Sequence, residues 1–423
     1  MNTTKFIGIA LLFLSVPGAR GEPFRTDINP ALRYYQAFLL APDPMSEADR
    51  DYLASKKGIE QKLPERFGKI VVGYDNQFLL VRQAAHATVP CDWGIDLNFG
   101  GPNTMLPHLG RAKAVCRTAQ LRAVWALQHG RQEDARDELL AAFVLGRNAG
   151  SDPIVIGALV QYAIEGLDYG TVAQYFGEFS PETLKQLVDG FDAAPARLTM
   201  AACIPSEKHF VDWLSSKLLE LQQAHPGDDA KVMADLRECG VVMAMEVVGN
   251  TNFWPRLVAA AGGTSEGVVR LLRETEPLFP RMAEILALPP AEHEIQAKQF
   301  LAEIHKSQNP FFTGFEFLLT GWTLGQQKLQ IRPGEFRVQA QLAMVHAGAE
   351  YKLHGESGLR SVMDPFGNGP FDFQRFVFKG VHRGFELKSA YAGTDAPFVM
   401  IFVEKQGPAF QVIGPDAGKA IAQ

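Results

Sequence analysis

Apolar residues recur at helical spacing over most of the chain between residues 28 and 330. After Arg332-Pro333-Gly334 one more long helix is expected, followed by short stretches rich in aromatic and β-branched residues, which favour strands. These stretches lie at residues 371–378, 384–389 and 398–404, with 410–413 as a further candidate. The pattern therefore predicts a mostly α protein: an irregular bundle or solenoid of antiparallel helical hairpins with a small C-terminal antiparallel β-meander.

We expect the helical part to form one domain over residues 22–330, and the last long helix and the sheet to form a second unit over residues 331–423. The clearest helix presents one apolar face, formed by Leu109, Ala112, Cys116, Ala119 and Ala123. A turn at Gly130 leads into a returning helix, so residues 106–150 resemble a tetratricopeptide-type hairpin. Because the roughly 34-residue period is not sustained on either side, an irregular bundle with one such hairpin is an equal alternative.

The first 21 residues have the pattern of a secretory signal peptide. Lys5 precedes an apolar run at Phe6–Val16, and a small-x-small cleavage site follows at residues 19–21. This apolar run is too short to cross a bilayer core of about 30 Å. The sequence therefore predicts export, with a mature chain that begins at Glu22 and resides in a periplasm or outside the cell.

Composition and charge exclude several classes of protein. Hydrophobic residues make up 47% of the chain and charged residues 21%, a balance typical of globular and not of disordered proteins. The formal net charge of −6 shows no basic excess, which argues against binding to nucleic acid or to anionic membranes. The longest uncharged stretch after the signal, Pro153–Ile164, suits a buried helix and is too short to span a membrane.

Export would place the four cysteines, Cys91, Cys116, Cys203 and Cys239, in an oxidising compartment, where one or two disulfides are expected. Cys203 and Cys239 are disfavoured as partners, because the helical hairpin expected after Cys203 would hold them about 15 Å apart. Cys91 with Cys116 is the preferred pairing, and buried thiols are the alternative. No CxxC pair supports a zinc ribbon or a thioredoxin-like site.

No strong catalytic signature is present. The chain lacks HExxH, GxSxG, GxxxxGK[ST] and GxGxxG patterns and has no histidine pair at i, i+4, so neither a metal site nor a cofactor is expected. Two carboxylates stand out by their apolar surroundings, Glu165 in IVIGALVQYAIE and Glu246 in CGVVMAMEVVGN. Burial raises the pKa of a carboxyl, so facing helices could make them a glycosidase-like acid/base pair. The simpler alternative is that each accepts hydrogen bonds from the backbone or an arginine.

Residues 88–107 form an expected long ordered loop, a kind of segment that is often functional. Asp92, Trp93 and Asp96 in this loop, together with His108 just after it, form a candidate ligand site. Carboxylate oxygens suit Ca²⁺, although the spacing matches no calcium-loop template. The alternative is that Trp93 fills the helical core while the aspartates cap neighbouring turns.

The stretch Asp92-Trp93-Gly94, followed by Leu106-Pro107-His108-Leu109 and a helical hairpin, resembles segments of a family of uncharacterised exported bacterial proteins. Asp364-Pro365-Phe366-Gly367 resembles the "DPF.G.P" turn of the same family. The resemblance covers roughly residues 28–400. It implies an exported helical protein with a short C-terminal sheet, and it implies no catalytic residue because no activity is known for the family.

Two functions remain open. The stacked hairpins and the lack of a catalytic signature favour an exported non-catalytic protein that binds a protein partner or a cell-envelope component through a helical groove. The alternative is a secreted hydrolase of glycans or cell-wall polymers, with Glu165 and Glu246, or Asp92 and Asp96, as its acid/base groups.

Overall fold

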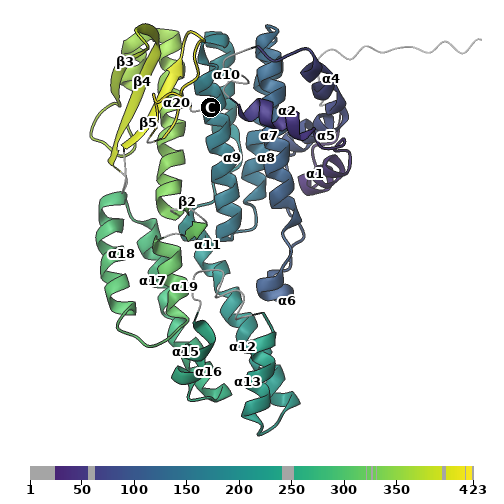
Figure 1. Cartoon of the computed structure of the whole chain (residues 1–423), viewed down its shortest axis with the longest axis vertical. Helices are drawn as coiled ribbons and strands as arrows, with labels where there is room; N and C mark the ends of the chain where they lie inside the picture. Colours follow the sequence, from purple (N-terminus) through teal and green to yellow (C-terminus); the bar gives the residue numbers. More distant parts are fainter. Residues whose placement is uncertain are drawn as a thin grey trace, which may run out of the picture.

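The computed structural model describes residues 24–55, 62–240, 252–320, 322–324, 327–329, 331–392, 397–414 and 416–421. Helices make up most of the described chain, and a three-stranded antiparallel sheet lies near its C-terminal end (Figure 1). The predicted fold class, mostly α with a small C-terminal β-meander, is confirmed. Within the described ranges, no helix combines the length and the apolar character needed to cross a membrane.

The N-terminal helices, purple in Figure 1, pack along one side of the molecule. They are α1 (Pro30–Leu39), α2 (Glu47–Ala54), α4 (Arg66–Gly73) and α5 (Asp75–Ala85). Pro64 and the apolar spacing after it predict one helix as far as about Ala87, whereas the structure has two helices that meet at Tyr74. Phe67 before the break and Phe78 after it belong to different apolar clusters, so the break lets each helix bury its own face.

Three long helices form the centre of the molecule: α7 (Pro107–Gln128), α8 (Gln132–Ala149) and α9 (Val155–Gln174). α7 and α8 form the predicted hairpin, and Gly130 makes its turn with a φ of +70°, a conformation that favours glycine. α8 and α9 approach closely at Gly146, where a Cβ atom would lie 2.6 Å from Cγ2 of Ile164. The absence of a side chain at Gly146 therefore lets the two helices lie this close together.

The chain continues through α10 (Pro181–Ala193) and α11 (Met200–Glu207) into shorter helices in the lower half of Figure 1. These are α12 (His209–Ala224), α13 (Asp229–Glu238), α15 (Phe253–Ala261), α16 (Ser265–Thr275), α17 (Leu278–Ala287), α18 (Pro290–Ile304) and α19 (Phe312–Thr320). The apolar spacing of the sequence predicts a single helix over residues 265–287. The structure has two helices there, because Pro277 has no amide hydrogen to continue the first. The sequence also predicts a helix over residues 229–249. The structure describes α13 as far as Glu238, and residues 241–251 lie outside the described residues.

The C-terminal part begins with a hairpin that the pattern did not predict, formed by β1 (Trp322–Leu324) and β2 (Gln327–Leu329). The predicted long helix follows as α20 (Ile331–Ser361), interrupted by non-helical backbone at Gly355. The sheet has the order β3 (Asp372–Phe378), β4 (Val381–Ala392), β5 (Pro397–Val403), all antiparallel. The candidate strand at 410–413 appears as isolated bridges.

One apolar core joins the helices to the sheet. Its members run from Ala123 on α7 to Phe402 on β5. Phe176, just after α9, meets Phe385 and Phe402 edge to face at centroid distances of 5.4 and 5.2 Å. Aromatic packing therefore holds the sheet on the end of α9.

Candidate functional site

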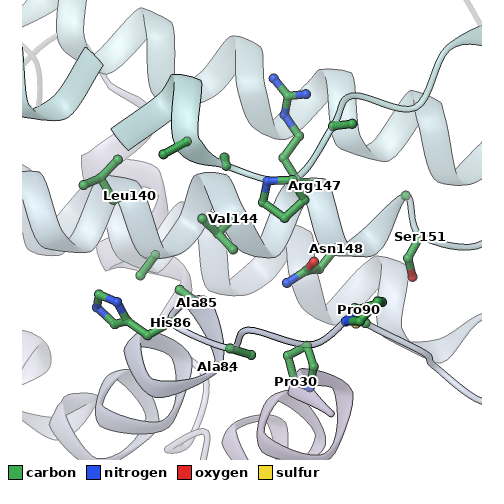
Figure 2. A pocket seen from close by; sticks show the side chains of 18 of the residues that line it. Pro30, Ala84, Ala85, His86, Pro90, Leu140, Val144, Arg147, Asn148 and Ser151 are labelled. Atoms are coloured by element: carbon green, nitrogen blue, oxygen red, sulfur yellow. The ribbon is translucent and has the colours of Figure 1, made fainter. Parts of the chain in front are cut away.

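A cleft of about 1110 Å³ lies over α8, between the N-terminal helices and the α10–α11 connection. Two non-helical segments form its opposite walls, residues 86–91 after α5 and residues 194–199 after α10. Figure 2 shows Val144, Arg147 and Asn148 of α8 above the wall that carries Pro90. Nearly half of the lining residues are alanine, glycine or proline, whose small side chains leave the cleft wide between elements that are close in space.

The floor of this cleft is built around Glu165, a completely buried residue of α9. Its Oε2 atom accepts hydrogen bonds from Nε and Nη2 of Arg197, at 2.9 and 2.7 Å. Its Oε1 atom lies 3.0 Å from Nε of Arg147 and accepts a hydrogen bond from Gln161 at 2.8 Å. Tyr169 donates to Oε2 at 3.2 Å, so both oxygens of the carboxylate are fully engaged.

Two arginines therefore share one carboxylate at the floor. The side chain of Arg147 is 6% exposed, and its Nε atom has no hydrogen bond of good geometry, despite its closeness to Glu165. Burial lowers the pKa of Arg147 while Glu165 opposes that shift, and an arginine keeps its charge in proteins. Burial and then the charge of Glu165 raise the pKa of Asp168, also on α9, well above its ordinary value, so a second negative charge beside Glu165 is disfavoured. One positive charge remains in excess at this floor.

The other two arginines of the cleft have carboxylate partners of their own. Nη1 of Arg82 binds Oε1 of Glu138 at 2.7 Å, and Nη2 of Arg136 lies 2.7 Å from Oδ1 of Asp137. Glu138 also binds the buried Arg122, which has Asp75 as a second partner at 2.9 Å. Positive charge is thus balanced at these positions, and the excess is confined to Arg147 and Arg197.

This arrangement suits an anionic group of a ligand. Guanidinium groups bind carboxylate and phosphate oxygens through strong charge-assisted hydrogen bonds, and these are stronger where water is excluded. The small apolar side chains of the walls leave room for the uncharged remainder of such a ligand.

Trp93 and His108, two of the predicted site residues, lie together in the interior behind the cleft. Their rings stack with centroids 4.5 Å apart, and both residues are buried. Nε1 of Trp93 donates to the carbonyl oxygen of Asn148 at 2.7 Å, which ties the loop to the end of α8. Burial lowers the pKa of His108 to about 4, so it is neutral near pH 7.

Asp92 and Asp96, the other predicted members of that site, are exposed. The Oδ1 atom of Asp92 accepts a hydrogen bond from the amide of Gly94 at 2.8 Å and so closes a local turn. Within the part of the chain that the structure describes, no three His, Cys, Asp or Glu side chains converge as metal ligands would. The four residues therefore do not share one pocket.

Of the two carboxylates proposed as an acid/base pair, the structure describes only one. Glu165 pairs with two arginines, as in the simpler alternative given above for this carboxylate. Glu246 lies outside the described residues. The pairing of Glu165 with Glu246 stays a prediction.

The four cysteines carry free thiols in this structure. Cys116 is buried on α7, where its Sγ atom lies 3.9 Å from Oδ1 of Asp168. Cys91 lines the cleft, and burial raises the pKa of its thiol to about 12. The Cys91–Cys116 disulfide stays a prediction for the exported protein.

Sequence reasoning did not single out Arg147 and Arg197, the two residues that make the cleft floor positively charged. The sequence does indicate that Arg147 is buried, because it follows the inward-facing Gly146 on a helix whose neighbouring positions are apolar. A charged residue at such a position needs a partner, and the apolar run that ends at Glu165 offered one. Arg197 lies in the short loop Ala194–Leu198 and gave no comparable signal.

Comparison of this chain with models of protein families, with curated proteins and with solved structures finds no match.

Proposed function

We propose that this is an exported, non-catalytic binding protein whose cleft over α8 holds a cell-envelope ligand with a carboxylate group. The observation that carries the proposal is the sharing of one buried carboxylate, Glu165, by Arg147 and Arg197. Export itself rests on the signal-like pattern of residues 1–21.

The charge of the floor supports an anionic ligand. Arg147 and Arg197 share a single carboxylate, and positive charge that lacks a counter-charge is costly to bury, so an anionic group in the cleft would offset it. The lining supports a small or peptide-like body for the rest of the ligand, because alanine, glycine and proline leave space for backbone and for short side chains.

The proposal is tested on the mature chain, residues 22–423, by thermal shift and by calorimetric titration. The probes are acetyl-trialanine with a free C-terminal carboxylate, the same peptide as an amide, and glycerol 3-phosphate. A ligand at a hundredfold excess over its Kd stabilises the folded state by about 2.7 kcal/mol. We expect the carboxylate peptide to bind and its amide not to bind, whereas binding of the phosphate alone would assign the floor to phosphorylated ligands instead.

Two variants separate the floor from the rest of the cleft. Arg147→Met removes the excess charge and keeps the Arg197–Glu165 pair, so it should abolish binding and leave the protein folded. Arg136→Met is the matched control, because this arginine lines the same cleft but is paired with Asp137. Equal binding by both variants, or no binding of any anionic probe to the wild type, would overturn the proposal.

A further inference from the structure

A second cavity of about 360 Å³ lies away from the cleft and shares no lining residue with it. It is bordered by the start of α9, the junction of α11 with α12, the helices α17 and α19, and the segment around α6 (Leu97–Gly100). Its volume is within the range of about 300–1,000 Å³ that is typical of sites for small molecules.

The walls of this cavity are predominantly apolar. Five phenylalanines contribute, namely Phe210, Phe279, Phe311, Phe315 and Phe317. Aliphatic side chains fill much of the remainder, among them Leu106, Ile154, Ile156, Val211 and Leu318. Gly314 is also a lining residue, and a Cβ atom built there would meet no other atom within 4 Å. The cavity therefore has the surface of a site for an apolar or aromatic group.

Glu207 is the only carboxylate among the lining residues, and neither lysine nor arginine accompanies it. Its Oε1 atom accepts a hydrogen bond from the amide of Val155 at 2.8 Å, so Glu207 caps the N-terminus of α9 and is held in place. Burial raises the pKa of Glu207, while the bond from Val155 and the neighbouring His209 oppose this shift. A carboxylate is thus fixed by one oxygen at the edge of an aromatic cavity.

We propose that this cavity binds a small molecule with an apolar body and one primary ammonium group, which donates to Glu207. An ammonium ion would pair with the carboxylate where little water competes, and the phenylalanine faces would add cation–π attraction. An anionic ligand would meet the charge of Glu207, and a neutral one would gain no ion pair. The inference is independent of the ligand proposed for the cleft.

The test uses the mature chain and three probes of equal length: n-octylammonium, n-octanol and n-octanoate. Calorimetric titration at pH 7 should show n-octylammonium binding about tenfold or more tightly than n-octanol, and n-octanoate should not bind. Equal affinity for the amine and the alcohol, or preference for the acid, would overturn the assignment.

Two variants locate the site. Glu207→Gln keeps an acceptor for the Val155 amide but removes the charge, so it should reduce the amine affinity about tenfold or more and leave the alcohol affinity unchanged. The matched control is Glu284→Gln, a substitution at an exposed position of α17, the helix that carries Phe279. Both variants should melt cooperatively, and equal amine affinity in both would contradict the role of Glu207.

Gly314→Leu provides a second measurement that does not depend on Glu207. Gly314 lines the cavity and a Cβ atom there meets nothing within 4 Å, so the added side chain has room to take up part of the cavity and should abolish binding of every octyl probe. Arg147→Met should leave amine binding intact even though it alters the cleft. Amine binding that survives Gly314→Leu, or that is lost in Arg147→Met, would place the amine elsewhere and refute the proposal.

Discussion

The Nε atom of Arg147 lies 3.0 Å from Oε1 of Glu165, a carboxylate that Arg197 already holds through two hydrogen bonds to its other oxygen. The pair is buried at the floor of the cleft, where charges without partners are costly. Because two arginines share one carboxylate, replacing the carboxylate should change the free energy of unfolding more than replacing either arginine.

Glu165→Gln should destabilise the protein by about 3–5 kcal/mol, because it leaves two buried arginines without a counter-charge. Arg147→Met should be neutral or slightly stabilising, since one arginine still balances Glu165. Urea unfolding at pH 7 measures both free energies. Similar stability of Glu165→Gln and the wild type would show that the shared carboxylate does not hold the floor together.

Acid should destabilise the protein through His108. The pKa of this histidine is about 4 in the folded state, against about 6.5 in an unfolded chain, because burial disfavours its charged form. The unfolded state therefore binds a proton first as the pH falls, and stability is lost between pH 6.5 and pH 4. At pH 5 the expected loss is about 2 kcal/mol.

His108→Gln removes this titration, so the difference in unfolding free energy between pH 7 and pH 5 should shrink by about 2 kcal/mol. Burial also lowers the pKa of His293 to about 4, so replacing His293 should reduce the pH dependence of the unfolding free energy in the same way at a position far from Trp93 in the sequence. Urea unfolding at both pH values measures the effect. An unchanged pH difference in His108→Gln would show that the histidine is not held neutral.

Asp168→Asn should stabilise the protein at neutral pH. Burial raises the pKa of Asp168 in the folded protein. As the pH rises above about 4, this carboxyl therefore ionises first in the unfolded state. From there the wild type loses about 1.4 kcal/mol of stability per pH unit, until the carboxyl ionises in the folded state as well. Asparagine has no such titration. The gain over the wild type should therefore be larger at pH 7 than at pH 4 in urea unfolding, and a gain independent of pH would contradict the shift.

A pair of glycine substitutions tests the packing of α8 on α9. Gly146→Ala places a Cβ atom 2.6 Å from Cγ2 of Ile164 and should destabilise the protein by about 1–3 kcal/mol. Gly110→Ala, at an exposed position of α7 where a Cβ atom meets nothing within 4 Å, should stabilise it by about 0.5–1 kcal/mol. Thermal unfolding of the two variants should therefore move in opposite directions.

Export predicts the start of the mature chain. When the complete sequence is expressed in a bacterial host, N-terminal sequencing of the protein from the periplasm or the medium should begin at Glu22 or a close neighbour. A chain that keeps residues 1–21 and stays in the cytoplasm would refute the proposed location.

The sequence by itself determined where most of the helices and strands lie. Apolar spacing located the α7–α8 hairpin and the strands of the C-terminal sheet, because a residue that packs against a core must repeat with the period of its own element. The same spacing joined α4 to α5 and α16 to α17, since two helices that follow each other directly can preserve an apolar pattern across the break.

Only the tertiary structure decided which side chains meet. Glu165 stood out in the sequence as a buried carboxylate, but its partners lie on α8 and in the loop after α10. Glu207 likewise lines one cavity together with phenylalanines from three different helices. Periodicity reports which face of an element is buried, whereas the crossing and spacing of helices determine what that face touches. For that reason the cleft, its excess positive charge and the aromatic cavity follow from the packing of the chain and not from its local pattern.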